Sequence, residues 1–165
     1  MSEQPRTGID EQELAAFLVE AKKATYAGNG TEVTPERPGF KELEYSQEKW
    51  NYRDSYVGFF SAPGQEVVRF QGKPVWIMSY SGGMRPLFNT NIVYAKEVFA
   101  FLKRCLLLIP EDSPFRGPKL HEEGDWKYTN NVQGDLSYFF GYESIFHQSE
   151  LVFRQQYIGG AVREK

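Results

Sequence analysis

Two glutamates, Glu66 and Glu143, are the residues of this sequence best placed to do chemistry. Each lies two positions before an aliphatic residue, Val68 or Ile145, so in a strand the two side chains would share one face. A carboxylate on an otherwise apolar face must be ion-paired, solvated in a cleft or shifted in pKa. Beside aromatic rings, two such carboxylates would suit a cationic or amine-bearing ligand. The simpler interpretation is that each glutamate caps a turn or accepts a hydrogen bond from a nearby backbone amide.

Aromatic side chains supply the second part of a candidate site. They make up 16% of the chain, and tryptophan and tyrosine recur at strand-like positions. Such residues usually fill a core or pair across strands, but their polar tips also suit the rim of a ligand pocket. We therefore expect a groove that contains at least one of the two glutamates and several of these aromatics. The candidate ligand-binding residues are Glu66, Glu143, Trp50, Trp76, Tyr80, Trp126 and Tyr157.

The sequence carries no motif that names a reaction. Its imidazoles are His121 and His147 and its one thiol is Cys105, which is too few at ligand spacing to predict a metal site. It has no nucleophile elbow, no Cys-x-x-Cys and no His-Glu-x-x-His. We expect neither metal nor cofactor. An enzyme built from this chain would use Glu, Asp or Tyr as acid or base, although Asp54 and Asp135 are expected to pair with an arginine or a turn amide.

Composition and charge argue against two classes of partner. The net charge is −3 and no run of Lys and Arg exceeds two residues, whereas nucleic-acid-binding proteins usually carry a basic patch. The most apolar run, 105–109, is far shorter than the ~20 residues that span a bilayer. The first residues lack the basic and apolar regions of a signal peptide. We expect a cytoplasmic protein that binds neither nucleic acid nor membrane.

The positions of the candidate residues follow an internal repeat with an offset of 77 residues. Segments 64–83 and 141–160 align without a gap and share seven of 20 residues, where chance would give roughly one. The matched pairs include Glu66 with Glu143 and Tyr80 with Tyr157. Self-similarity at a fixed offset indicates repeated architecture, and two related units usually leave a groove at their junction. The alternative is that two aromatic meanders converged by chance.

Each half of the chain predicts a helix, a proline-containing loop and an antiparallel meander. Asp10 and Asn91 are the expected N-caps of helices 11–23 and 92–108. The expected strands are 41–47, 50–60, 65–71 and 74–81, then 126–129, 136–142, 143–147 and 151–158. Together they predict an α+β fold with two helices packed on a sheet or half-barrel. The chain is expected to be a single domain, 1–165, made of two repeats at about 11–83 and 92–160.

Four segments of the chain resemble an uncharacterised domain family: Tyr52–Gly58, Gly64–Val68, Gly72–Gly82 and Pro114–Pro118. The resemblance covers nearly the whole chain after about Leu14. Members of that family occur alone, or behind a helix-turn-helix of the XRE repressor type in transcriptional regulators. The family has no assigned activity, so the resemblance implies no catalytic residue. It implies a module that elsewhere sits where an effector-sensing domain would sit.

Three functions are compatible with these patterns. The first is a small-molecule-binding or sensor-type domain with an aromatic groove. One alternative is a protein-interaction or dimerisation module, with a second copy of the chain as partner. Another is an enzyme that acts on a small substrate through Glu, Asp or Tyr. A deep cavity with a buried, unpaired carboxylate would favour the first and the last, whereas a filled core with an exposed apolar patch would favour the interaction module.

Overall fold

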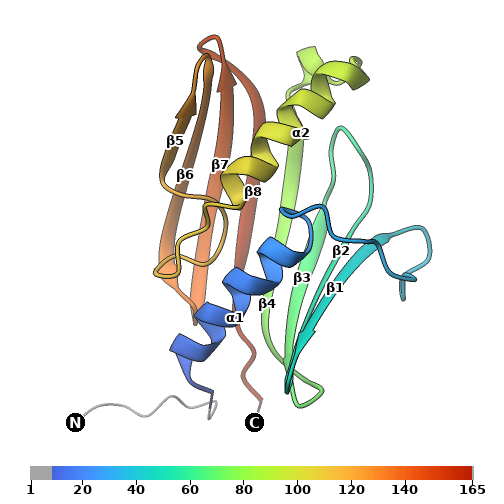
Figure 1. Cartoon of the computed structure of the whole chain (residues 1–165), viewed down its shortest axis with the longest axis vertical. Coiled ribbons are helices and arrows are strands. Elements are labelled where there is room, and N and C mark those ends of the chain that lie inside the picture. Colours follow the sequence, from blue (N-terminus) through green and yellow to red (C-terminus); the bar gives the residue numbers. More distant parts are fainter. Residues whose placement is uncertain (1–8, 165) are drawn as a thin grey trace.

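The computed structural model describes residues 9–164, in which two helices cover one face of an open, eight-stranded antiparallel sheet (Figure 1). This confirms the α+β fold class. The start of the chain, on which the expected absence of a signal peptide rests, lies mostly outside the described residues. The elements are α1 (Glu11–Ala24), β1 (Lys41–Gln47), β2 (Trp50–Tyr56), β3 (Gly64–Phe70), β4 (Lys73–Met84), a 3-10 turn (Pro86–Phe88), α2 (Ile92–Leu106), β5 (Leu120–Glu123), β6 (Trp126–Asp135), β7 (Tyr138–His147) and β8 (Glu150–Ala161).

Both helices begin at the predicted capping residues. Asp10 Oδ1 accepts a hydrogen bond from the Gln12 backbone amide at 2.7 Å, and Asn91 Oδ1 accepts one from the Tyr94 amide at 3.0 Å. Each bond satisfies an amide that has no partner within the helix. Helix α2 ends at Leu106, two residues before the predicted end. Within residues 9–164, neither helix is both long and apolar enough to cross a membrane.

The sheet joins two four-stranded meanders at its centre. The strand order is β1-β2-β3-β4-β8-β7-β6-β5, so every strand pairs with a neighbour in sequence except at the β4–β8 contact, where Tyr80 lies opposite Tyr157. Each tyrosine also lies opposite a glycine of the preceding strand, Gly64 or Gly141. A Cβ atom on Gly141 would come within 2.6 Å of the Tyr157 ring. The matched glycines of the repeat therefore leave room for the matched tyrosines.

Several strand predictions differ from the structure, and β6, for example, continues to Asp135 instead of ending at 129. Strands expected at 136–142 and 143–147 form one strand, β7, because Gly141 stays within the ladder instead of breaking it. Strand β2 ends at Tyr56 and not at 60, since Gly58 turns the chain with φ of +102°. Strand β5 was not among the predicted strands, and it places His121 in a strand at the edge of the sheet.

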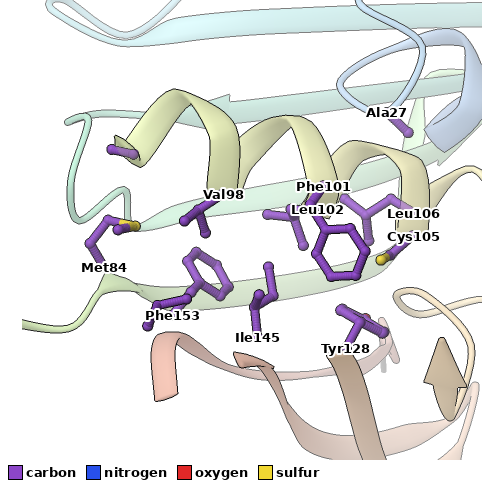
Figure 2. Close-up of a cluster of buried hydrophobic side chains, with 12 residues drawn as sticks. Ala27, Met84, Val98, Phe101, Leu102, Cys105, Leu106, Tyr128, Ile145 and Phe153 are labelled. Atoms are coloured by element: carbon purple, nitrogen blue, oxygen red, sulfur yellow. The ribbon is translucent and has the colours of Figure 1, made fainter. Parts of the chain in front are cut away.

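The hydrophobic core is divided into two clusters, one beneath each helix. Residues of α1 such as Phe17 and Leu18 pack with Val68 and Trp76 of the first meander. Figure 2 shows the second cluster, in which α2 directs Val98, Phe101, Leu102, Cys105 and Leu106 at Tyr128, Ile145 and Phe153 of the sheet. Phe101 and Cys105 are completely buried, as the apolar face of this helix predicts.

Candidate functional site

A layer of buried polar side chains lies between the two hydrophobic clusters. Along β8, Gln155 is flanked on the helix-facing side by Phe153 of one cluster and Tyr157 of the other. The same layer contains three carboxyl groups and two cations, all less than a tenth exposed: Asp54, Glu66, Glu143, Lys22 and Arg116. Buried charges must be paired or hydrogen-bonded, so their partners define the chemistry of the site.

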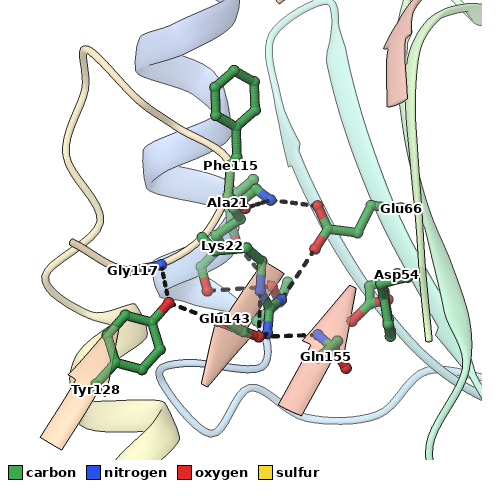
Figure 3. Close-up of polar contacts among 12 residues, drawn as sticks. Ala21, Lys22, Asp54, Glu66, Phe115, Gly117, Tyr128, Glu143 and Gln155 are labelled. Carbon is green, nitrogen blue, oxygen red and sulfur yellow. Dashed lines mark hydrogen bonds and ion pairs between the residues drawn. The ribbon is translucent and has the colours of Figure 1, made fainter. Parts of the chain in front are cut away.

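Glu143 is the most highly bonded residue of the layer (Figure 3). Its Oε1 accepts from Arg116 Nε at 2.9 Å, Arg116 Nη2 at 2.6 Å and Gln155 Nε2 at 3.0 Å. Its Oε2 accepts from the Tyr128 hydroxyl at 2.6 Å, and that hydroxyl in turn accepts from the Gly117 backbone amide at 3.0 Å. Glu143 therefore anchors the loop that follows α2 to the floor of the sheet.

Glu66 pairs with cations from two separate elements. Lys22 Nζ, from α1, lies 2.5 Å from Glu66 Oε2 and also donates to the Phe115 carbonyl oxygen at 2.6 Å. Arg116 Nη1 lies 3.8 Å from Glu66 Oε1. Burial lowers the pKa of Lys22, and the Glu66 carboxylate beside it acts in the opposite direction. The charges of these two cations and two glutamates balance without any ligand.

Asp54 makes the charges of this layer unequal when it is ionised. Its Oδ1 accepts from the Tyr80 hydroxyl at 2.6 Å, and no cation forms an ion pair with it in the described part of the chain. Burial, together with the nearby Glu66 carboxylate, raises the pKa of Asp54 from 3.8 to about 7. Protonated Asp54 leaves the layer neutral, whereas ionised Asp54 gives it a net negative charge.

The second meander contains a neutral version of the same contact. Asn130 pairs with Glu143 across the strands as Asp54 pairs with Glu66. The Tyr157 hydroxyl donates to Asn130 Oδ1 at 2.7 Å, just as the Tyr80 hydroxyl donates to Asp54. An amide therefore fits this tyrosine contact without a charge, and the carboxyl group in the first meander is not required by packing.

A groove of about 550 Å³ opens beside Asp54, between α2 and strands of the first meander. Its polar floor contains Asp54, Tyr80, Arg116 and Gln155. The volume is within the range of small-molecule sites, which combine apolar walls with a few polar groups. The groove walls include the aromatic residues Tyr26, Tyr56, Phe59, Phe99 and Phe153 and the basic residues Lys41, Lys96, Lys103 and Arg104.

Of the residues expected to bind a ligand, Tyr80 lines this groove. Glu66 instead lines a small cavity of about 20 Å³, together with Lys22 and Tyr52, and this cavity shares Asp54 and Arg116 with the groove. Glu143 is completely buried beside Arg116 and does not line the groove. The cationic partner expected for the two glutamates is thus supplied within the protein by Lys22 and Arg116.

The three tryptophans and Tyr157 lie outside the 550 Å³ groove. Trp50 stacks on Phe17, with ring centroids 5.3 Å apart. Trp76 is completely buried and stacks on Phe139 at 5.4 Å. Trp126 stacks on His147, with ring centroids 3.9 Å apart. Tyr157 is buried, and its hydroxyl is hydrogen-bonded to Asn130.

Sequence reasoning missed the two cations that complete the polar layer. Lys22 follows Ala21 on the buried side of α1, one turn beyond Leu18, and this position could have marked it as a buried lysine. Arg116 lies in a loop between prolines, where no periodic pattern reports burial. Within residues 9–164, no group of three or more His, Cys, Asp or Glu side chains is arranged to hold a metal ion.

Comparison with known protein families gives a match. The model of a family described as "Domain of unknown function (DUF5680)" matches residues 54–162, about two thirds of the chain. The matched segment begins at Asp54 and includes the floor of the groove and the whole second meander. No curated protein matches the chain. No solved structure matches it either.

Proposed function

Because the chain belongs to the DUF5680 family, whose description assigns no activity, we propose a function from its own geometry: it is a small-molecule-binding module of the sensor type. The proposed site is the groove between α2 and the first meander. Its proposed polar contacts are Asp54, Tyr80 and Gln155. Glu66 and Glu143 position the floor through Lys22 and Arg116 and do not bind the ligand directly.

The observation that carries this proposal is the buried carboxyl group of Asp54. Its raised pKa means that the ionised form destabilises the folded protein near neutral pH. A neutral amide makes the equivalent contact at Asn130, so a less costly side chain fits the same geometry. Strongly perturbed ionisable groups in a groove are typical of functional sites, because binding and catalysis require what stability alone would not retain. Asp54 has both properties, because its pKa is raised and its side chain lines the groove.

We also propose that the two halves, 11–83 and 92–160, arose by internal duplication. Support comes from β-bulges at Val68/Arg69 and Ile145/Phe146, which are separated by the 77-residue offset of the sequence repeat. In this proposal both halves line the groove, and the first half differs from the second at Asp54, where the second half has Asn130. An experimental structure in which Tyr80 and Tyr157 failed to superpose, after alignment of the halves, would contradict it.

The resemblance to domains that follow XRE-type helix-turn-helix segments is consistent with a sensor. Such a domain would report a small molecule to a partner module, and a cytoplasmic location belongs to the same proposal. This reading requires ligand binding but no chemical step, which agrees with the lack of a catalytic motif in the sequence.

Ligand binding in the groove is tested by a thermal-shift screen of small molecules sorted by charge. A ligand present at about 100 times its Kd should add roughly 2.7 kcal/mol, which corresponds to about 5–10 °C in Tm for a domain of this size. Ala100→Trp should abolish the shift, because Ala100 lines the groove. Val93→Trp is the matched control, since Val93 is an exposed α2 residue outside the groove lining. Shifts that survive Ala100→Trp would place binding elsewhere and refute the proposal.

A second candidate function, homodimerisation, is favoured by the sheet face that carries no helix. There Tyr138, Phe140, Tyr142 and Ile158 are 60, 44, 42 and 50% exposed. Three of them border a hollow of about 640 Å³. A second copy would present the same apolar groups, so an isologous contact matches apolar with apolar surface.

Sedimentation velocity over a range of protein concentrations tests the dimer. If this face forms it, Ile158→Ser should raise the dimer dissociation constant by at least about tenfold, because the contact loses a buried aliphatic group. Leu87→Ser makes a similar change at a residue that is 83% exposed on the 3-10 turn, and it should have no effect. A wild-type protein that stays monomeric throughout would exclude this candidate.

A further inference from the structure

The charges around the groove define the class of molecule that it can hold. Its lining contains five basic side chains, namely Lys41, Lys96, Lys103, Arg104 and Arg116, and one carboxyl group, that of Asp54. We infer that the ligand is a small organic anion with a flat, apolar body. This inference rests on the proposed binding function and names its ligand class. It reverses the cationic ligand that the two glutamates suggest from sequence.

Some of these basic groups are already neutralised by the protein. Arg116 Nη2 lies 2.6 Å from Glu143 Oε1, and Arg104 Nη2 lies 2.9 Å from Glu123 Oε2. Lys41 is near a carboxylate too, with its Nζ 3.9 Å from Glu32 Oε1. These three cations therefore add little unbalanced charge to the groove.

The two lysines of α2 are different, because no carboxylate forms an ion pair with either within residues 9–164. Lys103 Nζ donates to Asn29 Oδ1 at 2.7 Å and lies 4.7 Å from the centroid of the Tyr26 ring. Burial lowers the pKa of Lys103, because its ammonium group has lost part of its contact with water. Lys96 is exposed at the groove wall. An anion supplied from outside would give both ammonium groups the partner that the protein does not provide.

The spacing of the lysines fits a ligand with an apolar body. Lys96 and Lys103 are seven residues apart, so they lie on the same face of α2 about 10 Å from each other. Phe99 and Ala100 line the groove between them. The ring of Phe99 meets that of Phe59 edge to face, with centroids 5.4 Å apart. A flat ring system can pack against these two aromatics while its anionic group reaches an ammonium group.

Asp54 does not oppose an anion on the groove floor. Its pKa of about 7 leaves it largely protonated below neutral pH, where it carries a hydroxyl donor instead of a negative charge. The Tyr80 hydroxyl donates to Oδ1, so Oδ2 is the oxygen left to donate to a ligand. The floor then contributes hydrogen bonds, and the helix wall contributes charge.

Two fluorescent probes that differ only in charge test this inference directly. The anionic probe is 1-anilinonaphthalene-8-sulfonate, and the neutral probe is N-phenyl-1-naphthylamine, which has the same ring system without the sulfonate. At low ionic strength and pH 6.5, the anionic probe should bind about tenfold more tightly than the neutral one, since one compensated charge contributes about that factor. In the double variant Lys96→Gln/Lys103→Gln, the preference should disappear through weaker binding of the anionic probe alone.

The control for charge is Lys119→Gln/Lys127→Gln, which removes two exposed lysines that do not line the groove. It should leave both dissociation constants unchanged. Equal affinity for the two probes, or an equal loss of both in the α2 double variant, would overturn the anionic ligand class. Binding of either probe that persists in Ala100→Trp would instead refute the groove as the site. The two failures are therefore distinguishable.

Discussion

Replacing Asp54 with asparagine is expected to stabilise the protein by about 4 kcal/mol at pH 8, the free-energy equivalent of a carboxyl pKa raised from 3.8 to about 7. The protonated form of Asp54 adds no charge to the buried layer, and its contribution to stability is fully present below pH 3.8. That contribution is lost as the pH rises from about 4 through 7, because the unfolded chain releases the proton before the native protein does. Asparagine removes this loss and keeps an oxygen acceptor for the Tyr80 hydroxyl.

Urea titrations between pH 4 and 8 provide the measurement. The difference in unfolding free energy between variant and wild type should be small at pH 4, should grow up to about pH 7 and should then level off towards pH 8. Asp112→Asn serves as the matched control, because Asp112 is exposed and its replacement should change stability by less than about 0.5 kcal/mol. A difference that does not vary with pH would show that Asp54 is not protonated in the native protein near neutral pH.

If protonated Asp54 donates to the ligand, the same substitution should stabilise the protein and weaken binding below pH 7, because an amide N–H is a weaker hydrogen-bond donor than a carboxylic acid O–H. Such a trade-off is expected where a site retains a group that stability alone would eliminate. Stabilisation with unchanged ligand affinity would separate the two roles and leave Asp54 without a part in binding.

The second large effect is expected at Glu143. Glu143→Gln should destabilise the protein by about 3–5 kcal/mol, because it leaves the buried Arg116 guanidinium without its carboxylate. The hydroxyl of Tyr128 and the amide of Gln155 lose the same charged acceptor. Unfolding free energies from urea titration at pH 7 give the measurement.

An exposed ion pair gives the control for this variant. Glu122 lies 4.0 Å from Lys127, and both side chains are about half exposed or more. Glu122→Gln should therefore cost at most about 1 kcal/mol. A double-mutant cycle with Arg116→Gln should recover a coupling energy of more than about 1 kcal/mol, as expected for residues in direct contact. Additive losses would mean that the Arg116–Glu143 pair does not act as a unit.

Local sequence patterns predicted the helices and strands of this fold better than the side-chain contacts between them. The capping residues Asp10 and Asn91 begin their helices as expected, because a cap depends on a few neighbouring residues. The rule that a carboxylate on an apolar strand face needs a partner also holds for Glu66 and Glu143. The identity of those partners was beyond local reasoning. Lys22 is 44 residues from Glu66 in sequence, so only the tertiary fold brings the two together.

The candidate site was predicted less well than the fold, and Asp54 illustrates the reason. Its sequence context predicts a strand residue beside an arginine, with no indication of burial or of a raised pKa. The raised pKa arises first from burial in the folded protein and then from the carboxylate of Glu66 on the neighbouring strand, whereas the charge of Lys22 lowers it. The tryptophans illustrate a second reason, because a pattern of aromatics does not distinguish a packed core from the wall of a groove. Trp76, for example, is completely buried.

The pairing of β4 with β8 at the centre of the sheet has a consequence for how the chain folds during its synthesis. All other strand pairs form between neighbours in sequence, so the first helix and its four strands can assemble as soon as they leave the ribosome. The partner of β4 is the last strand of the chain, separated from it by α2 and three other strands. Until β8 is synthesised, β4 is an unpaired edge able to recruit a strand from another nascent chain. The central contact of the mature sheet is thus the point at which the growing polypeptide is most exposed to aggregation.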